Sequence, residues 1–250
     1  MKIYLATGNL NKKKEMSEIL TDFTVVIPSD EGINFDPEET GTTFYENSLI
    51  KARALWEIVH CPVIADDSGI CVDALNGIPG VYSSRYAGPD FPQGRPDKVK
   101  IPQAEQNRLL IEQTNEALKN KKAYDSPCPA AETAPLCGNA DSRALKIPNG
   151  KLHGENGHFD KSYDGRSCRY VCSMVLFLSK DRFFVAQETM EGRLVKDISE
   201  SAGTGGFGYD PIFFLPQYGC TAAQLTAEQK NAISHRGKAV QAVKKIFPLI

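Results

Sequence analysis

Two adjacent aspartates, Asp66 and Asp67, follow the short apolar run PVIA at residues 62–65. Buried carboxylates are costly and repel each other, so the pair predicts a bound cation, with Mg²⁺ the first candidate, or a shifted protonation state. We expect a strand to end at this pair. Side chains alternate along a strand, so one of the two acids is expected to face a site, while a turn closed by Asp and Gly is the alternative.

Two further stretches could hold a phosphate chain or its metal ion. The sequence ATGN at residues 6–9 lies between an apolar run and a helical pattern. This order predicts that backbone N–H groups, the positive end of a helix and Lys12 face an anion. An ordinary glycine turn with a helix cap is the alternative. The acidic sequence DPEETG at 36–41 could supply a metal ligand or form a solvated loop.

A basic cluster lies near the end of the chain, in KNAISHRGKA at residues 230–239. It contains Lys230, His235, Arg236 and Lys238 beside predicted helix starts. Basic side chains and free backbone N–H groups suit an oligophosphate or the edge of a base. The alternative is an exposed basic helix face.

The sequence GTGGFGYDPIFF at residues 203–214 combines glycines with aromatic rings. Its glycines favour a loop that closes over a ligand, and Phe207 offers a flat face on which a purine can stack. Asp210 suits a place near a base or ribose, because phosphates would repel its charge. The acid pair, the ATGN loop, the basic cluster and this glycine–aromatic loop together predict a magnesium–nucleotide site, but they do not choose between hydrolysis, phosphoryl transfer and nucleotide sensing.

Composition indicates an ordinary globular chain. Of its 250 residues, 41% are hydrophobic and 24% charged, and the formal net charge is −2. This balance disfavours a protein that coats nucleic acid, and we expect no stable nucleic-acid partner. No apolar run approaches the roughly 18 residues that span a membrane, and the start of the chain lacks the ordered regions of a signal peptide. We therefore expect a cytoplasmic protein without a membrane partner.

The cysteines favour neither disulfides nor zinc. Seven cysteines without regular spacing are typical of reduced thiols. Cys128, Cys137, His153 and His158 follow one another in the order of a zinc site. The eight residues between the two cysteines exceed the two to four that such sites usually have, so the pattern disfavours zinc.

Hydrophobic periodicity outlines the elements that must position these residues. It predicts strands at 2–6, 23–27, 62–65, 168–179, 181–188 and 192–198, and helices at 43–59, 97–119 and 226–247, with a further helix after ATGN and with Ser234 able to cap a second C-terminal segment. Strands and helices do not alternate strictly, so we expect a mixed sheet. Residues 1–250 are expected to form one domain, with an insertion at about 120–165 that is rich in Pro, Gly and Asn.

These blocks, in this order, resemble the Ham1-like family of inosine triphosphate pyrophosphatases. The matching text is ATGNLNKKKE, EETGTTFYENSLIKA, IADDSGICVDALNGIPGVYSSRYAG, GTGGFGYDPIFF and KNAISHRGKA, within residues 1–118 and 166–247. The resemblance implies an elongated α/β protein, in which a mixed β-sheet with flanking helices forms two lobes around a central cleft. It also implies a homodimer that requires Mg²⁺.

The resemblance implies hydrolysis of noncanonical purine nucleoside triphosphates (ITP, dITP and XTP) to the monophosphate and pyrophosphate, which keeps deaminated purines out of DNA and RNA. Asp67 is implied as the catalytic base, and Glu39 and Asp67 as the metal ligands. The implied substrate-binding residues are Thr7, Gly8, Asn9, Lys12, Lys51, Ser68, Phe207, Gly208, Tyr209, Asp210, Lys230, His235 and Arg236.

Arg236 suggests how a base could be selected. A 6-oxo purine presents two acceptors, O6 and N7, which an arginine can meet in bidentate fashion, whereas adenine presents an amino donor there. We therefore hypothesise that Arg236 selects 6-oxo purines. The alternatives are a hydrolase for another nucleotide and a catalytically silent nucleotide- or nucleic-acid-binding module. The intact Asp66–Asp67 pair and the mildly acidic charge count against the silent module.

Overall fold

The computed structural model describes residues 2–121 and 165–249, so the insertion predicted at about 120–165, with its cysteines and histidines, lies almost entirely outside the described residues. In those residues seven strands form one sheet in the order β2-β1-β3-β4-β5-β6-β7. The strands are β1 (Lys2–Leu5), β2 (Thr24–Val26), β3 (Val63–Val72), β4 (Ser167–Ser179), β5 (Arg182–Leu194), β6 (Phe213–Leu215) and β7 (Cys220–Thr221). β1 is parallel to β2 and β3, and every later pair is antiparallel. The predicted mixed sheet is confirmed.

Most of the α-helices begin at a side chain that accepts from free backbone N–H groups. The α-helices are α1 (Leu10–Ile19), α2 (Phe44–Val59), α3 (Gln103–Lys121), α4 (Ala227–Ile233) and α5 (His235–Lys244). Thr43 caps α2 and forms a reciprocal capping box with Glu46. Ser234 ends α4 and caps α5 by accepting from the backbone N of Gly237 at 3.0 Å, as predicted. A cap of this kind contributes about 1 kcal/mol.

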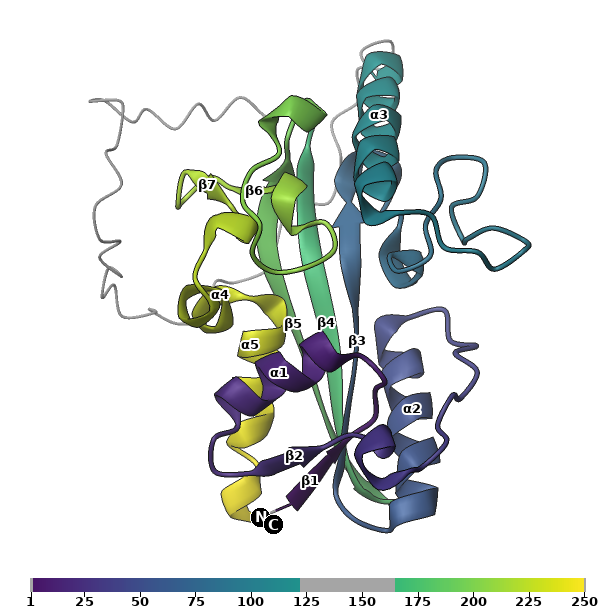
Figure 1. Cartoon of the computed structure of the whole chain (residues 1–250), viewed down its shortest axis with the longest axis vertical. Coiled ribbons are helices and arrows are strands. Elements are labelled where there is room, and N and C mark those ends of the chain that lie inside the picture. The colour runs from purple at the N-terminus through teal and green to yellow at the C-terminus, as the bar shows by residue number, and fades with distance from the viewer. Residues whose placement is uncertain (1, 122–164, 250) are drawn as a thin grey trace.

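Helices cover both faces of the sheet where β3 and β4 run side by side (Figure 1). On one face, α2 packs Ala52 and Leu55 against Val63, Ala65 and Val175. On the other face, α1 and α5 enclose an apolar cluster of residues from the helices and from β1, β3 and β4, which includes Met16, Ile64, Met174, Ala239 and Val240. The alternation of β3 therefore sends even-numbered side chains toward α1 and α5, and odd-numbered ones toward α2.

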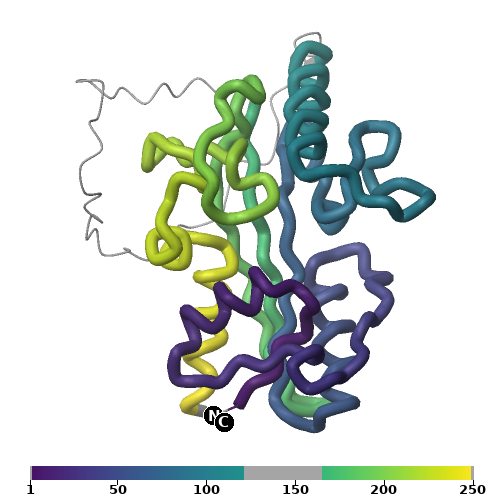
Figure 2. The backbone as a smooth tube through the Cα atoms, in the orientation of Figure 1, coloured from purple at the N-terminus to yellow at the C-terminus, as the bar shows by residue number. Residues whose placement is uncertain are grey.

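A second core makes the other lobe. There α3, β6 and the start of β4 bury Tyr86, Leu110, Tyr170 and Phe213. The long strands β3, β4 and β5 run through both lobes and join them, which gives the molecule its elongated outline (Figures 1 and 2). The predicted two-lobed α/β architecture is confirmed. Among the described residues, no helix has the length and apolarity needed to cross a membrane.

Three predicted element bounds are wrong. β3 does not end at the acid pair but continues to Val72, because β4 pairs with it along its whole length, so the alternative of a turn is also wrong. The helix expected from residue 97 starts at Gln103, just after Pro102, because a proline disfavours helical backbone in the residue before it. The separate strand expected at 192–198 is the end of β5, which stops at Leu194.

Candidate active site

A cavity of about 510 Å³ is lined by every residue that the family resemblance implied in substrate or metal binding. Its wall includes Thr7, Gly8, Asn9, Lys12, Glu39, Lys51, Asp67, Ser68, Phe207, Gly208, Tyr209, Asp210, Lys230, His235 and Arg236. These residues come from distant parts of the chain and from both lobes. Their convergence supports a shared site, while the role of each remains a prediction.

The loop before α1 forms one part of the wall. Thr7 Oγ1 accepts from the backbone N of Asn9 at 3.1 Å, and Asn9 Oδ1 accepts from the backbone N of Asn11 at 2.9 Å. A Cβ on Gly8 would meet nothing within 4 Å, so the space beside this loop is open. The N-terminal end of α1, with the positive end of its dipole, thus borders the cavity, as suits an anion.

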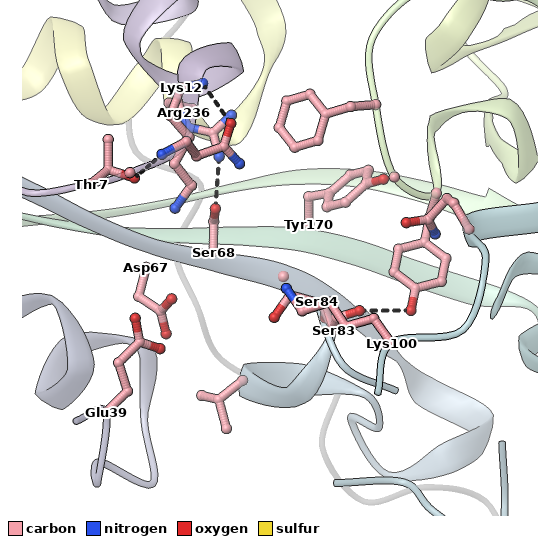
Figure 3. A pocket seen from close by; sticks show the side chains of 18 of the residues that line it. Thr7, Lys12, Glu39, Asp67, Ser68, Ser83, Ser84, Lys100, Tyr170 and Arg236 are labelled. Carbon is pink, nitrogen blue, oxygen red and sulfur yellow. Dashed lines mark hydrogen bonds between the residues drawn. The ribbon is translucent and has the colours of Figure 1, made fainter. Parts of the chain in front are cut away.

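Glu39, Lys51 and Asp67 form a compact charge cluster on the α2 side of β3. Lys51 Nζ donates to Glu39 Oε1 at 2.9 Å and to Asp67 Oδ1 at 3.2 Å. Figure 3 shows the carboxylates of Glu39 and Asp67 pointing toward each other. The expected solvated loop at 36–41 is therefore tied to α2 by an ion pair of Glu39, whose side chain is 32% exposed.

Asp66 faces the opposite side of β3. Its Oδ2 lies 3.0 Å from Lys12 Nζ and accepts from Arg236 Nε at 3.2 Å. Ser68, two residues on, points the same way and accepts from Arg236 Nη2 at 2.8 Å (Figure 3). Asp66 is fully buried, and burial opposes its ionisation. Lys12 and Arg236 nevertheless hold the pKa of Asp66 well below its usual range.

The loop at 203–210 carries the other acid of the cavity. Asp210 Oδ2 accepts from Lys230 Nζ at 2.6 Å and from the backbone N of Phe207 at 2.8 Å. The ring centroid of Phe207 lies 5.0 Å from Lys230 Nζ and 5.5 Å from Arg236 Cζ. Asp210 therefore restrains the loop through the backbone of Phe207 and also binds Lys230. The ammonium of Lys230 lies close to the Phe207 ring, which is a cation–π arrangement.

The C-terminal basic cluster is buried. Lys230, His235 and Arg236 are 8%, 5% and 3% exposed, so the alternative of an exposed basic helix face is wrong for them. Lys238 does point outward, and its Nζ donates to the carbonyl of Thr189 at 2.6 Å. Burial, together with the charges of Arg236 and Lys230, lowers the pKa of His235 well below its ordinary value, so this imidazole is neutral at pH 7.

Asp67 keeps a raised pKa despite its lysine partner. Burial raises the pKa of this carboxyl more than the charges of Lys51 and Lys12 lower it. Burial also disfavours the charge on Lys51, but Asp67 and Glu39 together raise the pKa of that ammonium. Asp67 is thus a better proton acceptor than an exposed aspartate, next to a lysine that stays charged.

Two residues that the sequence analysis did not single out contact the predicted site residues. Glu15 lies one helical turn after Lys12 on α1, pairs with Arg236 and lies 3.5 Å from Lys230 Nζ. Asn47 lies one turn before Lys51 on α2 and donates from Nδ2 to Asp67 Oδ2 at 3.3 Å. Helical spacing of three or four residues from a predicted lysine could have identified both.

The donor set suits magnesium better than zinc. Glu39 and Asp67 each accept a hydrogen bond from the Lys51 ammonium. Two hard oxygen ligands therefore converge around a positive charge. Across residues 2–121 and 165–249, no three His, Cys, Asp or Glu gather in a metal-binding group. Mg²⁺ is usually held by one or two carboxylates together with waters and substrate phosphates, whereas structural zinc takes four protein ligands.

A cavity with a carboxylate pair, lysines, the positive end of a helix and an aromatic ring has the composition of an enzyme site for an anionic ligand that bears a flat ring. The chain belongs to the Ham1 family, whose model matches residues 3–158 and 143–246. It is similar to the dITP/XTP pyrophosphatase of Treponema denticola, with 43% identity over 247 residues, 99% of this chain and 98% of that protein.

Other proteins are also similar to this chain over nearly its whole length. The dITP/XTP pyrophosphatase of Escherichia coli K12 is 36% identical over 244 residues, 96% of this chain and 94% of that protein. A HAM1 protein from Coxiella burnetii has a solved structure that matches with a TM-score of 0.67 at 30% identity over 100% of both chains. The Staphylococcus aureus Ham1 protein matches with a TM-score of 0.63 at 30% identity, covering 99% of this chain and 98% of that one.

Proposed function

We propose that this protein hydrolyses the noncanonical purine nucleoside triphosphates ITP, dITP and XTP to the nucleoside monophosphate and pyrophosphate. Such an activity removes deaminated purines from the pool from which DNA and RNA are made. One observation carries the proposal: a single cavity holds the Glu39–Lys51–Asp67 cluster and the Phe207 ring with its basic neighbours. The names of the full-length relatives point to the same reaction.

The phosphate chain binds beside α1 in this proposal. The backbone N–H of Gly8 and the positive end of the helix attract phosphate oxygens. Lys12 and Lys51 supply positive charge. Lys12 Nζ lies 3.0 Å from Asp66 Oδ2, and Lys51 Nζ lies 3.2 Å from Asp67 Oδ1. Both ammonium groups are therefore held beside the cavity, where they offset the charge that develops on the departing pyrophosphate.

Asp67 is the proposed general base. It accepts the proton of the water that attacks the α-phosphorus, and its raised pKa makes it suited to that role. Glu39 and Asp67 would hold Mg²⁺, which neutralises phosphate charge and acidifies water when bound. Lys51 keeps the two carboxylates together through its two hydrogen bonds.

The base binds against Phe207 in this proposal. Stacking of a base on an aromatic ring contributes about 1–3 kcal/mol and does not depend on which base is bound. Selection therefore needs hydrogen bonds, and Arg236 can read O6 and N7 of a 6-oxo purine. Nε of the guanidinium donates to Asp66, Nη1 to Glu15 and Nη2 to Ser68, so the group is held in place. Each Nη group carries a second N–H with which it can read the base.

A panel of nucleoside triphosphates tests the function. We expect dITP, ITP and XTP to be hydrolysed far faster than ATP and GTP, with pyrophosphate as the first product, and a metal chelator to stop the reaction. Orthophosphate as the first product would refute the cleavage position. Equal rates on ITP, ATP and GTP would refute the specificity.

The proposal includes the setting of the enzyme. We expect a homodimer that acts on the cytoplasmic nucleotide pool, checked by sedimentation and by cell fractionation. We also expect the chain to be one domain with an insertion at about 120–165. Limited proteolysis inside the insertion should leave a single cooperative unfolding transition, and two separate transitions would contradict the single domain.

A further inference from the structure

Asn47 and Lys51 lie four residues apart on α2 and therefore on one face of that helix. Each of them touches Asp67 and also reaches the loop at residues 39–41. Lys51 does so through Asp67 Oδ1 and Glu39 Oε1. Asn47 does so through Asp67 Oδ2 and the backbone of Gly41. The helix thus holds the two predicted metal ligands through two parallel bridges.

Both halves of the Asn47 amide are used. Its Oδ1 accepts from the backbone N of Gly41 at 2.8 Å, and its Nδ2 donates to Asp67 Oδ2 at 3.3 Å. The residue is only 1% exposed, so water does not replace either contact. A residue with only a donor or only an acceptor would lose one of the two contacts, and an apolar residue would lose both.

The loop approaches Asn47 closely enough to require a glycine. A Cβ on Gly41 would lie 2.6 Å from Asn47 Oδ1 and 2.9 Å from its backbone N, closer than real Cβ atoms come. Glu39 lies two residues before this contact in a segment without helix or strand. The hydrogen bond to Gly41 therefore restrains the loop that carries Glu39.

We propose that Asn47 is a positioning residue for the metal site, whose amide fixes the orientation of the Asp67 carboxylate and the distance of the Glu39 loop from it. The inference rests on the proposed function, in which Glu39 and Asp67 bind the metal. With Oδ2 held by Asn47, Oδ1 of Asp67 accepts from Lys51 Nζ, the same ammonium that donates to Glu39. Partners that orient metal-binding carboxylates typically change metal affinity by about 10- to 100-fold when they are replaced.

The first test uses metal binding without nucleotide. Asn47→Leu has nearly the shape of the parent side chain but makes neither hydrogen bond. We expect its affinity for Mn²⁺, measured by calorimetric titration of the folded protein, to fall about tenfold or more. Ser48→Ala is the matched control, because Ser48 is buried on the same helix and donates to the carbonyl of Ser173 at 2.6 Å without touching either carboxylate. It should keep parental Mn²⁺ affinity.

The second test uses the metal dependence of turnover. For Asn47→Leu we expect half-maximal dITP hydrolysis at about tenfold higher Mg²⁺, with partial recovery of kcat in excess Mg²⁺. Gly41→Ala disrupts the same contact from the side of the loop and should also lower Mn²⁺ affinity. It serves as the test if Asn47→Leu does not fold. A folded variant of either kind with parental Mn²⁺ affinity and Mg²⁺ dependence would overturn the inference. A parent protein that neither binds Mn²⁺ nor hydrolyses dITP would instead refute the proposed function.

Discussion

Asp66 and Asp67 are neighbours on β3, but their carboxylates lie on opposite faces of the sheet. Asp66 contacts Lys12 of α1 and Arg236 of α5, whereas Asp67 contacts Lys51 of α2. One strand thereby separates two acids that would otherwise repel each other, and each meets its own cations. The difference in environment appears in their pKa values, which are lowered for Asp66 and raised for Asp67.

Asp67→Asn tests the proposed base. The amide keeps the shape of the side chain but cannot accept a proton, so we expect kcat for dITP to fall by about 10²- to 10⁴-fold. The melting temperature should stay within a few degrees, because the substitution also removes a buried negative charge. Pyrophosphate release and thermal melts measure the two effects. Turnover close to that of the parent would exclude Asp67 as the base.

Arg236→Lys tests base selection while keeping the positive charge beside Asp66. Lysine cannot offer the planar pair of donors that reads O6 and N7 together. We expect the ratio of kcat/KM for dITP to that for dATP to fall about tenfold or more, the usual discrimination of a bidentate contact. The ratio is compared with the parent under identical conditions. An unchanged ratio would mean that other groups select the base.

Gly206→Ala tests the order of the 203–210 loop. Its φ is +68°, in the left-handed region, and an added Cβ would lie 2.0 Å from Asp210 Oδ2 and 2.9 Å from Lys230 Nζ. The Asp210–Lys230 pair must therefore move, so we expect a stability loss above the roughly 1–2 kcal/mol of left-handed strain alone. KM for dITP should also rise. Urea unfolding and steady-state kinetics measure both.

Gly219→Ala is the matched control for that variant. Gly219 also has a left-handed φ, +64°, but a Cβ there would meet nothing within 4 Å. It lies between β6 and β7, away from the cavity. We expect it to cost only the backbone strain, about 1–2 kcal/mol, with parental KM. Equal stability losses and equal KM values for the two variants would show that the loop tolerates a displaced Asp210.

The buried imidazole of His235 predicts a loss of stability in mild acid. Burial comes first among the causes that lower its pKa, followed by Arg236 and Lys230, while Asp66 acts in the opposite direction. In the unfolded chain the pKa is near 6.5. Below that pH the imidazole binds a proton in the unfolded state but stays neutral in the folded state. The contribution of His235 to the free energy of unfolding therefore falls as pH falls below about 6.5 and is constant at higher pH.

His235→Gln should remove this contribution. For the parent we expect a loss of up to about 1.4 kcal/mol from this residue for each pH unit below about 6.5. Urea unfolding at pH 7.5, 6.5 and 5.5 measures the slope for both proteins. The variant should show a shallower decline. Identical slopes would mean that His235 does not titrate differently in the folded and unfolded states.

The local features of the site could be predicted from the amino-acid sequence alone. Caps such as Ser234, the apolar run before Asp66 and the glycines around Phe207 depend on neighbours within a few residues, so their chemistry is visible in the chain. The order of the motifs was enough to identify the family and to select the residues of the cavity. The roles of these residues, and the metal, stay predictions that the experiments above test.

Which charged side chains contact each other depends on the tertiary structure. Whether β3 ends at Asp66 depends on β4, a partner that pairs Asp66 with Met174 from a distant part of the chain. The contacts of Arg236 with Asp66 and of Asn47 with Gly41 and Asp67 likewise depend on how helices pack on the sheet. Burial then decides the pKa values, because the same carboxyl is an ordinary acid in water and a shifted one inside the protein.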